Sequence, residues 1–343
     1  MNQEERPTKP NGLIRKLFGM NSGQTRTPDE IRDAVYLSTG DVPVKQSRFW
    51  LLLVLSGGIA AAGVIADSTA TVIGAMIVAP LATPIQGVGV SISYGEVRPM
   101  LASISILAAA AGAVIGIGLL FAWALPDVTP LTDNSQVTGR VSPTIVDLVA
   151  ATVTGLAGSI AIARRDIGDI LPGVAIAISL VPPLAVVGVT AEAGDWDGAL
   201  GALLLFLTNT LAMIVVGVLI FSGLQLVRGG RPKPAIGSAF TTVLVMTTIV
   251  VMALGVTTYR TVQQANKIAD ATEIGKSWAE KNGERLIEVR YQGDELVFIV
   301  EGMSDGSEDN QLPKLLKGQL PDGTPVVVNR IPGERIVLPD IGE

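Results

Sequence analysis

Long apolar runs separated by short polar turns occupy residues 49–258 of this chain. Each run approaches the roughly 20 residues that a helix needs to cross the hydrocarbon core of a bilayer. The pattern predicts a polytopic α-helical membrane protein of about seven transmembrane helices. The expected spans are about residues 49–66, 70–94, 98–125, 144–163, 168–190, 197–222 and 237–258.

Polar segments flank this block on both sides. Residues 1–48 predict a cytoplasmic N-terminal segment, in which Pro28 to Tyr36 forms a short helix with Thr27 as its N-cap. Residues 259–343 predict a separate soluble α+β domain with a hairpin turn at Gly293-Asp294. Its expected elements are a helix at 260–282, strands at 285–291 and 295–301, a short helix at 312–320, a strand at 325–331 and a fourth strand at 335–338.

Composition supports a membrane protein and limits its chemistry. Charged residues make up 16% of the chain, against about 25% in soluble domains, and the mean hydropathy is +0.49. The chain has no Cys and no His, which excludes disulfides, thiolate metal sites, cysteine nucleophiles and imidazole bases. We expect no cofactor, no metal site and no nucleic-acid partner; the expected partner is the lipid bilayer.

Basic residues alternate between the loops. The N-terminal segment and the turns after spans 2, 4 and 6 are basic, whereas the other three loops hold only Arg140. By the positive-inside rule, the N-terminus is cytoplasmic, and seven crossings make the C-terminal domain extracytoplasmic. If spans 2 and 5 were re-entrant loops, this alternation would be hard to explain. The predicted location is the cytoplasmic membrane. The basic residues of the three turns are Arg98, Arg164, Arg165, Arg228, Arg231 and Lys233.

A short motif occurs twice within the predicted spans. Val-Ala-Pro-Leu-Ala at 78–82 recurs as Val-Pro-Pro-Leu-Ala at 181–185, and Val-Gly-Val follows at 88–90 and 187–189. Each copy lies in the second span of a set of three. Because three crossings are an odd number, the second set must be inverted relative to the first, which predicts an inverted 3+3 repeat.

The prolines of the motif are candidate site residues. Pro80, Pro84, Pro182 and Pro183 remove main-chain donors within apolar runs. One interpretation is a simple kink that neighbouring helices satisfy. The other is two interrupted helices, whose freed carbonyls bind an ion or solute at the membrane middle.

Three polar side chains are further candidates for a pathway. Asp67 closes span 1 and Asp147 opens span 4, and a carboxylate near the hydrocarbon edge is costly unless it is paired. Both are also explained as ordinary boundary residues. Asn209, at the centre of span 6, either packs between helices or lines a pathway. Gly112 and Gly116 form a G-x-x-x-G in span 3, which serves close packing within the monomer or a homo-oligomer contact.

The run Ile73-Gly74-Ala75-Met76-Ile77-Val78-Ala79-Pro80-Leu81, followed by Pro84-Ile85, resembles the signature of a bacterial and archaeal family filed as domain of unknown function 389. The resemblance extends over roughly residues 45–225. It departs from the family pattern at Ala79, where Ser is expected, and this weakens a polar site at that position. The resemblance implies a hydrophobic membrane domain and supplies no activity.

The sequence favours a transporter or channel-like protein for a small solute or monovalent ion, with its site between the two proline segments. The alternative is a membrane-anchored scaffold or sensor, whose outer α+β domain binds a partner or envelope component. An enzyme is not expected: no Lys lies between Lys45 and Lys233 to activate a nucleophile, and only an Asp67–Asp147 pair remains conceivable.

Overall fold

A computed structural model gives the fold of residues 23–125, 130–167, 180–228, 267–292, 295–302, 309–317 and 324–332, with single positions between 241 and 255. The chain forms two compact units, residues 1–258 and 259–343, and each is described by itself.

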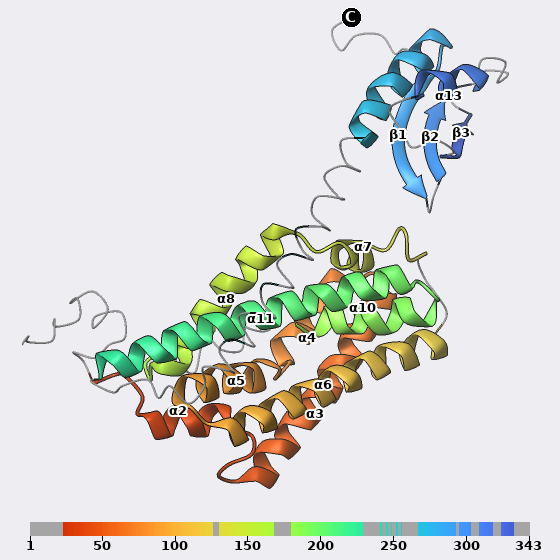
Figure 1. The fold of residues 1–343 in the computed structure, drawn as a ribbon. Helices are drawn as coiled ribbons and strands as arrows, with labels where there is room; N and C mark the ends of the chain where they lie inside the picture. The colour runs from red at the N-terminus through yellow and green to blue at the C-terminus, as the bar shows by residue number, and fades with distance from the viewer. Residues whose placement is uncertain are drawn as a thin grey trace, which may run out of the picture. The chain divides into compact units, whose positions relative to one another are not determined.

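The described part of the first unit is helical (Figure 1). Four helices are long and apolar enough to cross a membrane, and a fifth span arises if the bent pair α4 and α5 is counted as one. The first half of the predicted span 168–190, and most of 237–258, lie outside the described residues. The helices are α2 (Pro28–Val35), α3 (Val42–Ile65), α4 (Thr69–Val78), α5 (Ala82–Tyr94), α6 (Val97–Ala124), α7 (Ser135–Val141), α8 (Ile145–Ala163), α10 (Val181–Glu192) and α11 (Trp196–Val227).

Two short helices are buried among the long ones. In α5 every residue from Pro84 to Ser93 is buried, and in α10 every residue from Val181 to Thr190. The long helices instead expose large apolar side chains on one side, as lipid contact requires, including Leu51 and Val54 of α3, Leu119 and Leu120 of α6, Val149 and Val153 of α8, and Leu200 and Leu219 of α11.

The buried short helices pack on the long helices through glycine. Helix α5 lies on α11, where a Cβ on Gly89 would stand 3.4 Å from the Cα of Gly217. Helix α10 lies on α6, where a Cβ on Gly118 would stand 2.6 Å from the carbonyl oxygen of Ala185 and one on Gly188 would overlap the backbone of α6. Small residues let the helix backbones approach closely.

These two contacts are separated by the same number of residues. Gly188 follows Gly89 by 99 positions, and Gly217 follows Gly118 by 99. The starts of α5 and α10, and those of α6 and α11, are also 99 residues apart. The Val-Gly-Val motif follows this spacing, whereas the proline motif is spaced by 103. Because the helices are spaced by 99 residues, the counterpart of Pro183 is Pro84 and not Pro80.

The helices of the first unit meet at two opposite ends (Figure 1). At the α2 end, the Ala163 carbonyl ends α8 and accepts from the Arg26 amide at 2.9 Å, and Arg228 after α11 donates to the Arg26 carbonyl. At the α7 end, Asn134 donates to the Val64 carbonyl that ends α3, at 2.7 Å. Arg98, Arg164, Arg165 and Arg228 lie at the α2 end, and acidic Asp133, Asp195 and Asp197 lie at the other.

The predicted short helix before the first span is confirmed. Helix α2 begins after Thr27, which accepts from the Glu30 amide at 3.3 Å, while the Glu30 carboxylate accepts from the Thr27 amide at 2.7 Å. This reciprocal capping box satisfies two orphan amides. The buried face of α2, formed by Ile31 and Val35, packs with side chains of α5, α8 and α11.

The second unit is a small α+β fold, as predicted. Strands β1 (Arg285–Gln292) and β2 (Glu295–Glu301) form an antiparallel hairpin, and β3 (Val326–Ile331) pairs with β2 in parallel. The helical residues 267–281 and the short helix α13 (Leu312–Leu315) supply Trp278 and Leu312 to its core. The predicted fourth strand, 335–338, lies outside the described residues.

Candidate functional site

The apolar helix pair α4 and α5 is broken at Pro80. The axes bend by 47° across residues 79–81. Ala79 is extended, with φ −66° and ψ 127°, as a residue before proline prefers, and Pro80 has no amide hydrogen. Within this described stretch, no main-chain amide from residues 79–82 bonds back to the carbonyls of residues 75–78. The break therefore leaves the carbonyl end of α4 unpaired beside the amide end of α5, which has no side-chain cap.

The second proline segment begins a helix. Pro182 and Pro183 lie in the first turn of α10, where missing amides cost nothing. Residues 168–179, which precede them, lie outside the described residues, so the predicted second interruption remains a prediction. Leu81 and Leu180, which precede the two short helices, are 1% exposed and belong to one apolar core.

A polar contact in the bundle interior joins three helices. Gln86 of α5 and Ser159 of α8 are both 0% exposed, and their side chains lie 3.1 Å apart, from Ser159 Oγ to Gln86 Oε1. Gly217 of α11 faces this amide, because a Cβ on Gly217 would stand 2.8 Å from Gln86 Oε1. The amide nitrogen of Gln86 is buried and has no hydrogen-bond partner among the residues that the structure describes. Such a group costs roughly 1–3 kcal/mol of stability.

Sequence reasoning missed Gln86. The signal was present, because Gln86 and Asn209 are the only two carboxamide side chains in the seven predicted spans. An uncharged amide in hydrocarbon is costly without partners and deserves the scrutiny given to a carboxylate.

Asn209 lies in the interior, as its position in the span predicts. It is 2% exposed in the middle of α11. Its neighbour Thr208 donates to the Leu204 carbonyl at 2.7 Å, and the buried hydroxyl of Thr210 has no partner. Asn209, Met213 and Gly217 follow at intervals of four residues, which places Asn209 on the same face of α11 as the glycine opposite Gln86.

The two candidate carboxylates make local contacts at helix ends. Asp67 has a left-handed φ of 48° in the turn between α3 and α4, and accepts from Ser135 Oγ at 2.7 Å and the Gln136 amide at 3.1 Å. Asp147 accepts from the amide and the hydroxyl of Thr144, both at 2.8 Å, at the start of α8. These are the contacts of boundary residues, and no hydrogen bond of the described residues brings the two carboxylates together.

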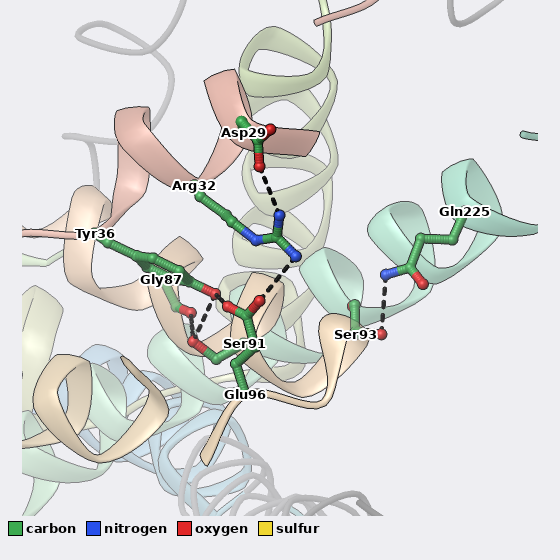
Figure 2. Close-up of polar contacts among 8 residues, drawn as sticks. All are labelled: Asp29, Arg32, Tyr36, Gly87, Ser91, Ser93, Glu96 and Gln225. Atoms are coloured by element: carbon green, nitrogen blue, oxygen red, sulfur yellow. Dashed lines mark hydrogen bonds and ion pairs between the residues drawn. The ribbon is translucent and has the colours of Figure 1, made fainter. Parts of the chain in front are cut away.

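A second polar cluster closes the α2 end (Figure 2). The Arg32 guanidinium pairs with Glu96 at 2.8 Å, and the Tyr36 hydroxyl donates to the other oxygen of Glu96, also at 2.8 Å. Ser91 of α5 donates to the Gly87 carbonyl at 2.7 Å and lies 3.1 Å from the Tyr36 hydroxyl. Burial raises the pKa of Tyr36, so it stays a neutral donor. The cluster fastens α2 over the end of α5.

The G-x-x-x-G of α6 does not pack within the monomer. Gly112 and Gly116 are exposed, and a Cβ at either position would meet nothing within 4 Å. The described residues therefore give no support to close packing inside the monomer, one of the two alternatives. The glycine of α6 that does approach another helix is Gly118, two residues further on. The homo-oligomer contact stays a prediction.

With this geometry in view, comparison with known proteins finds a family whose model matches part of the chain. Residues 76–215 match the family described as Domain of unknown function (DUF389). The match confirms the resemblance found in the proline-containing run, and the matched region includes the break at Pro80, Gln86 and Asn209. An uncharacterized protein of Methanocaldococcus jannaschii is 34% identical over 192 residues, which are 56% of this chain and 59% of that protein. No solved structure matches.

Proposed function

We propose that this chain is a transporter or channel-like protein of the cytoplasmic membrane, which moves a small solute or monovalent ion. The observation that carries the proposal is the half-buried break at residues 79–81, which leaves main-chain groups of an apolar helical bundle without a partner among the described residues. Non-helical backbone at membrane depth is tolerated where it is buried in protein or lines a cavity. The carbonyl end of one half-helix and the amide end of another are groups with which transporters bind ions and solutes.

The proposal includes an inverted 3+3 repeat. The glycine contacts of α5 with α11 and of α10 with α6 recur at a spacing of 99 residues, which supports a duplicated unit. The flanking long helices agree: Gly57 of α3 approaches Val114 of α6, and Gly155 of α8 approaches Met213 of α11, 99 positions after Val114. Helix α5 runs to the α2 end and α10 to the α7 end, as inverted units would.

Seven crossings, with the N-terminus in the cytoplasm and the C-terminal unit outside, complete the proposed topology. Its support is the collection of Arg residues at the α2 end and of acidic turns at the α7 end. The positive-inside rule assigns the α2 end to the cytoplasm.

Flux through purified protein in proteoliposomes tests the function. We expect passage of at least one of four probes (urea, glycerol, Rb⁺ and Cl⁻) above the rate of empty vesicles. Pro80→Ala, which restores an amide donor at the break, should reduce that flux while the protein stays folded by size-exclusion chromatography. Pro43→Ala is the matched control, because Pro43 lies in the first turn of α3. Absence of flux for all four probes contradicts the proposal.

The second candidate is a membrane-anchored scaffold or sensor, which the separate core of the C-terminal unit favours. Under this function the broken helix shapes packing only. Pro80→Ala would then change assembly or partner capture, and the wild-type protein would pass none of the probes.

A further inference from the structure

The polar contact at Gln86 has an apolar counterpart in the other half of the bundle. The residues 99 positions from Gln86, Ser159 and Gly217 are Ala185, Ala60 and Gly118. Ala185 and Ala60 are both 0% exposed. A Cβ added to Gly118 would contact the Ala185 carbonyl, just as a Cβ added to Gly217 would contact the Gln86 side chain. In one half of the bundle, therefore, alanines occupy the two positions that Gln86 and Ser159 occupy in the other half, and the helices still pack. Packing alone does not require an amide and a hydroxyl in the other.

Ser159 cannot satisfy the whole Gln86 amide. Its hydroxyl donates to the Gly155 carbonyl at 2.7 Å and lies 3.1 Å from Gln86 Oε1. A hydroxyl carries one proton, and Gln offers an acceptor at one end of its amide and two donors at the other. Whichever way the amide is turned, Ser159 contacts only one end, and the other end is left without a partner. A buried donor or acceptor of this kind is available to a ligand.

The surroundings of the amide are uncharged. Between their first and last turns, α5, α8, α10 and α11 contain no Asp, Glu, Lys or Arg. An amide and a hydroxyl stay neutral at every physiological pH, so nothing at this point compensates the charge of an ion removed from water. A neutral solute with a carbonyl or hydroxyl oxygen satisfies the amide without that cost.

We propose that Gln86, contacted by Ser159 and faced by Gly217, is the hydrogen-bonding contact that recognises a small neutral solute bearing a carbonyl or hydroxyl oxygen. The inference rests on the proposed transport function and specifies its substrate class. Sites built to hydrogen-bond a polar group reject analogues that lack it, because the buried amide is then left unpaired. Gly217, which has no Cβ, leaves room for the amide oxygen of Gln86.

The absence of native Cys allows a test that needs no knowledge of the solute. Gln86→Cys and Ala185→Cys are reconstituted separately and treated with a small, uncharged, water-soluble methanethiosulfonate reagent. We expect modification at position 86 and at least tenfold slower modification at position 185. If folded Gln86→Cys protein resists the reagent as Ala185→Cys does, water does not reach the amide and the inference is overturned.

Flux then tests the chemical class. We expect wild-type vesicles to pass urea or glycerol faster than Rb⁺ and Cl⁻. Gln86→Leu should lower the neutral flux at least tenfold without lowering the thermal unfolding midpoint, because it removes an unpartnered polar group. Gln86→Met provides the same measurement if the leucine variant does not fold. Loss of folding in both variants assigns Gln86 a structural role and overturns the inference.

A glycine pair on α11 supplies the matched control. Gly217→Ala should lower the neutral flux, since its Cβ would stand 2.8 Å from Gln86 Oε1, whereas Gly223→Ala meets nothing within 4 Å and should leave it unchanged. Equal flux in both variants contradicts the role of Gly217 in accommodating the amide of Gln86. If the wild type passes Rb⁺ or Cl⁻ but neither neutral probe, the proposed transport stands and this inference fails; if it passes none of the four, the proposed function itself fails.

Discussion

Gly188 of α10 lies directly against Gly118 of α6, so closely that a Cβ on Gly188 would overlap the Ile115 carbonyl and the Leu119 amide. No side chain at position 188 can be accommodated without moving the helix backbone. This contact fixes how deeply the buried helix α10 sits against its long neighbour. The contact also supports the spacing of 99 residues independently of the sequence motif.

We expect Gly188→Ala to destabilise the bundle by about 1–3 kcal/mol, the usual cost of overpacking a core. The thermal unfolding midpoint in detergent measures the effect. Gly112→Ala in α6 is the control, because its Cβ would meet nothing within 4 Å, and its midpoint should stay within error of the wild type. Equal midpoints for the two variants would show that α10 moves away from α6 without cost.

The Arg32–Glu96 ion pair should hold α2 over the end of α5. The two side chains are 33% and 27% exposed, and a pair of that kind contributes about 1 kcal/mol. We expect Glu96→Gln to speed amide hydrogen exchange in α2 about fivefold. Asp29→Asn removes the other carboxylate that contacts Arg32, but Asp29 is 91% exposed, so exchange should hardly change. The reverse order of effects would assign the fastening of α2 to Asp29.

Asp67 should make the contact between α7 and the α3–α4 turn sensitive to acid. The Ser135 hydroxyl and the Gln136 amide donate to this carboxylate and lower its pKa. Because the folded pKa lies below the unfolded value of about 3.9, the contact is fully stabilising above that value and is lost as the pH falls through the folded pKa. Hydrogen exchange of the α7 amides, corrected for intrinsic rates, should accelerate below about pH 4. In Asp67→Asn the profile should be flat, and a wild-type profile without any acid transition contradicts the assignment.

In the C-terminal unit, Arg330 compensates a buried carboxylate. Its guanidinium contacts Glu284 at 2.7 Å and Asp309 at 2.5 Å, and the Glu284 side chain is 1% exposed. Arg330→Ala leaves that charge uncompensated and should destabilise the unit by about 3–5 kcal/mol. Hydrogen exchange of β1 and β2 in the full chain reports the loss. Glu284→Gln in the Arg330→Ala background removes the buried charge and should restore part of the hydrogen-exchange protection. If it does not, the destabilisation comes from the lost packing of the Arg330 side chain and not from the uncompensated charge.

Much of the fold followed from local sequence patterns. The apolar runs indicated the long helices, Thr27 and Glu30 marked the start of α2, and alternation around Gly293-Asp294 marked the hairpin, because each signal depends on residues a few positions apart. The break at Pro80 was predictable for the same reason. The sequence offered two spacings for the repeat, 99 residues from the Val-Gly-Val motif and 103 from the proline motif, and the glycine contacts between packed helices decided for 99.

The candidate site shows the same division. The sequence by itself determined that the interior has no Cys or His and placed Pro80 and Asn209 within apolar helices. Only the tertiary structure decided that Asp67 and Asp147 serve local turns, that the G-x-x-x-G of α6 faces outward, and that Gln86 meets Ser159 and Gly217 from two other helices. The physical reason is that composition and periodicity fix what a segment can be, whereas the partner of a buried polar group depends on residues distant in the chain that packing brings within hydrogen-bond reach.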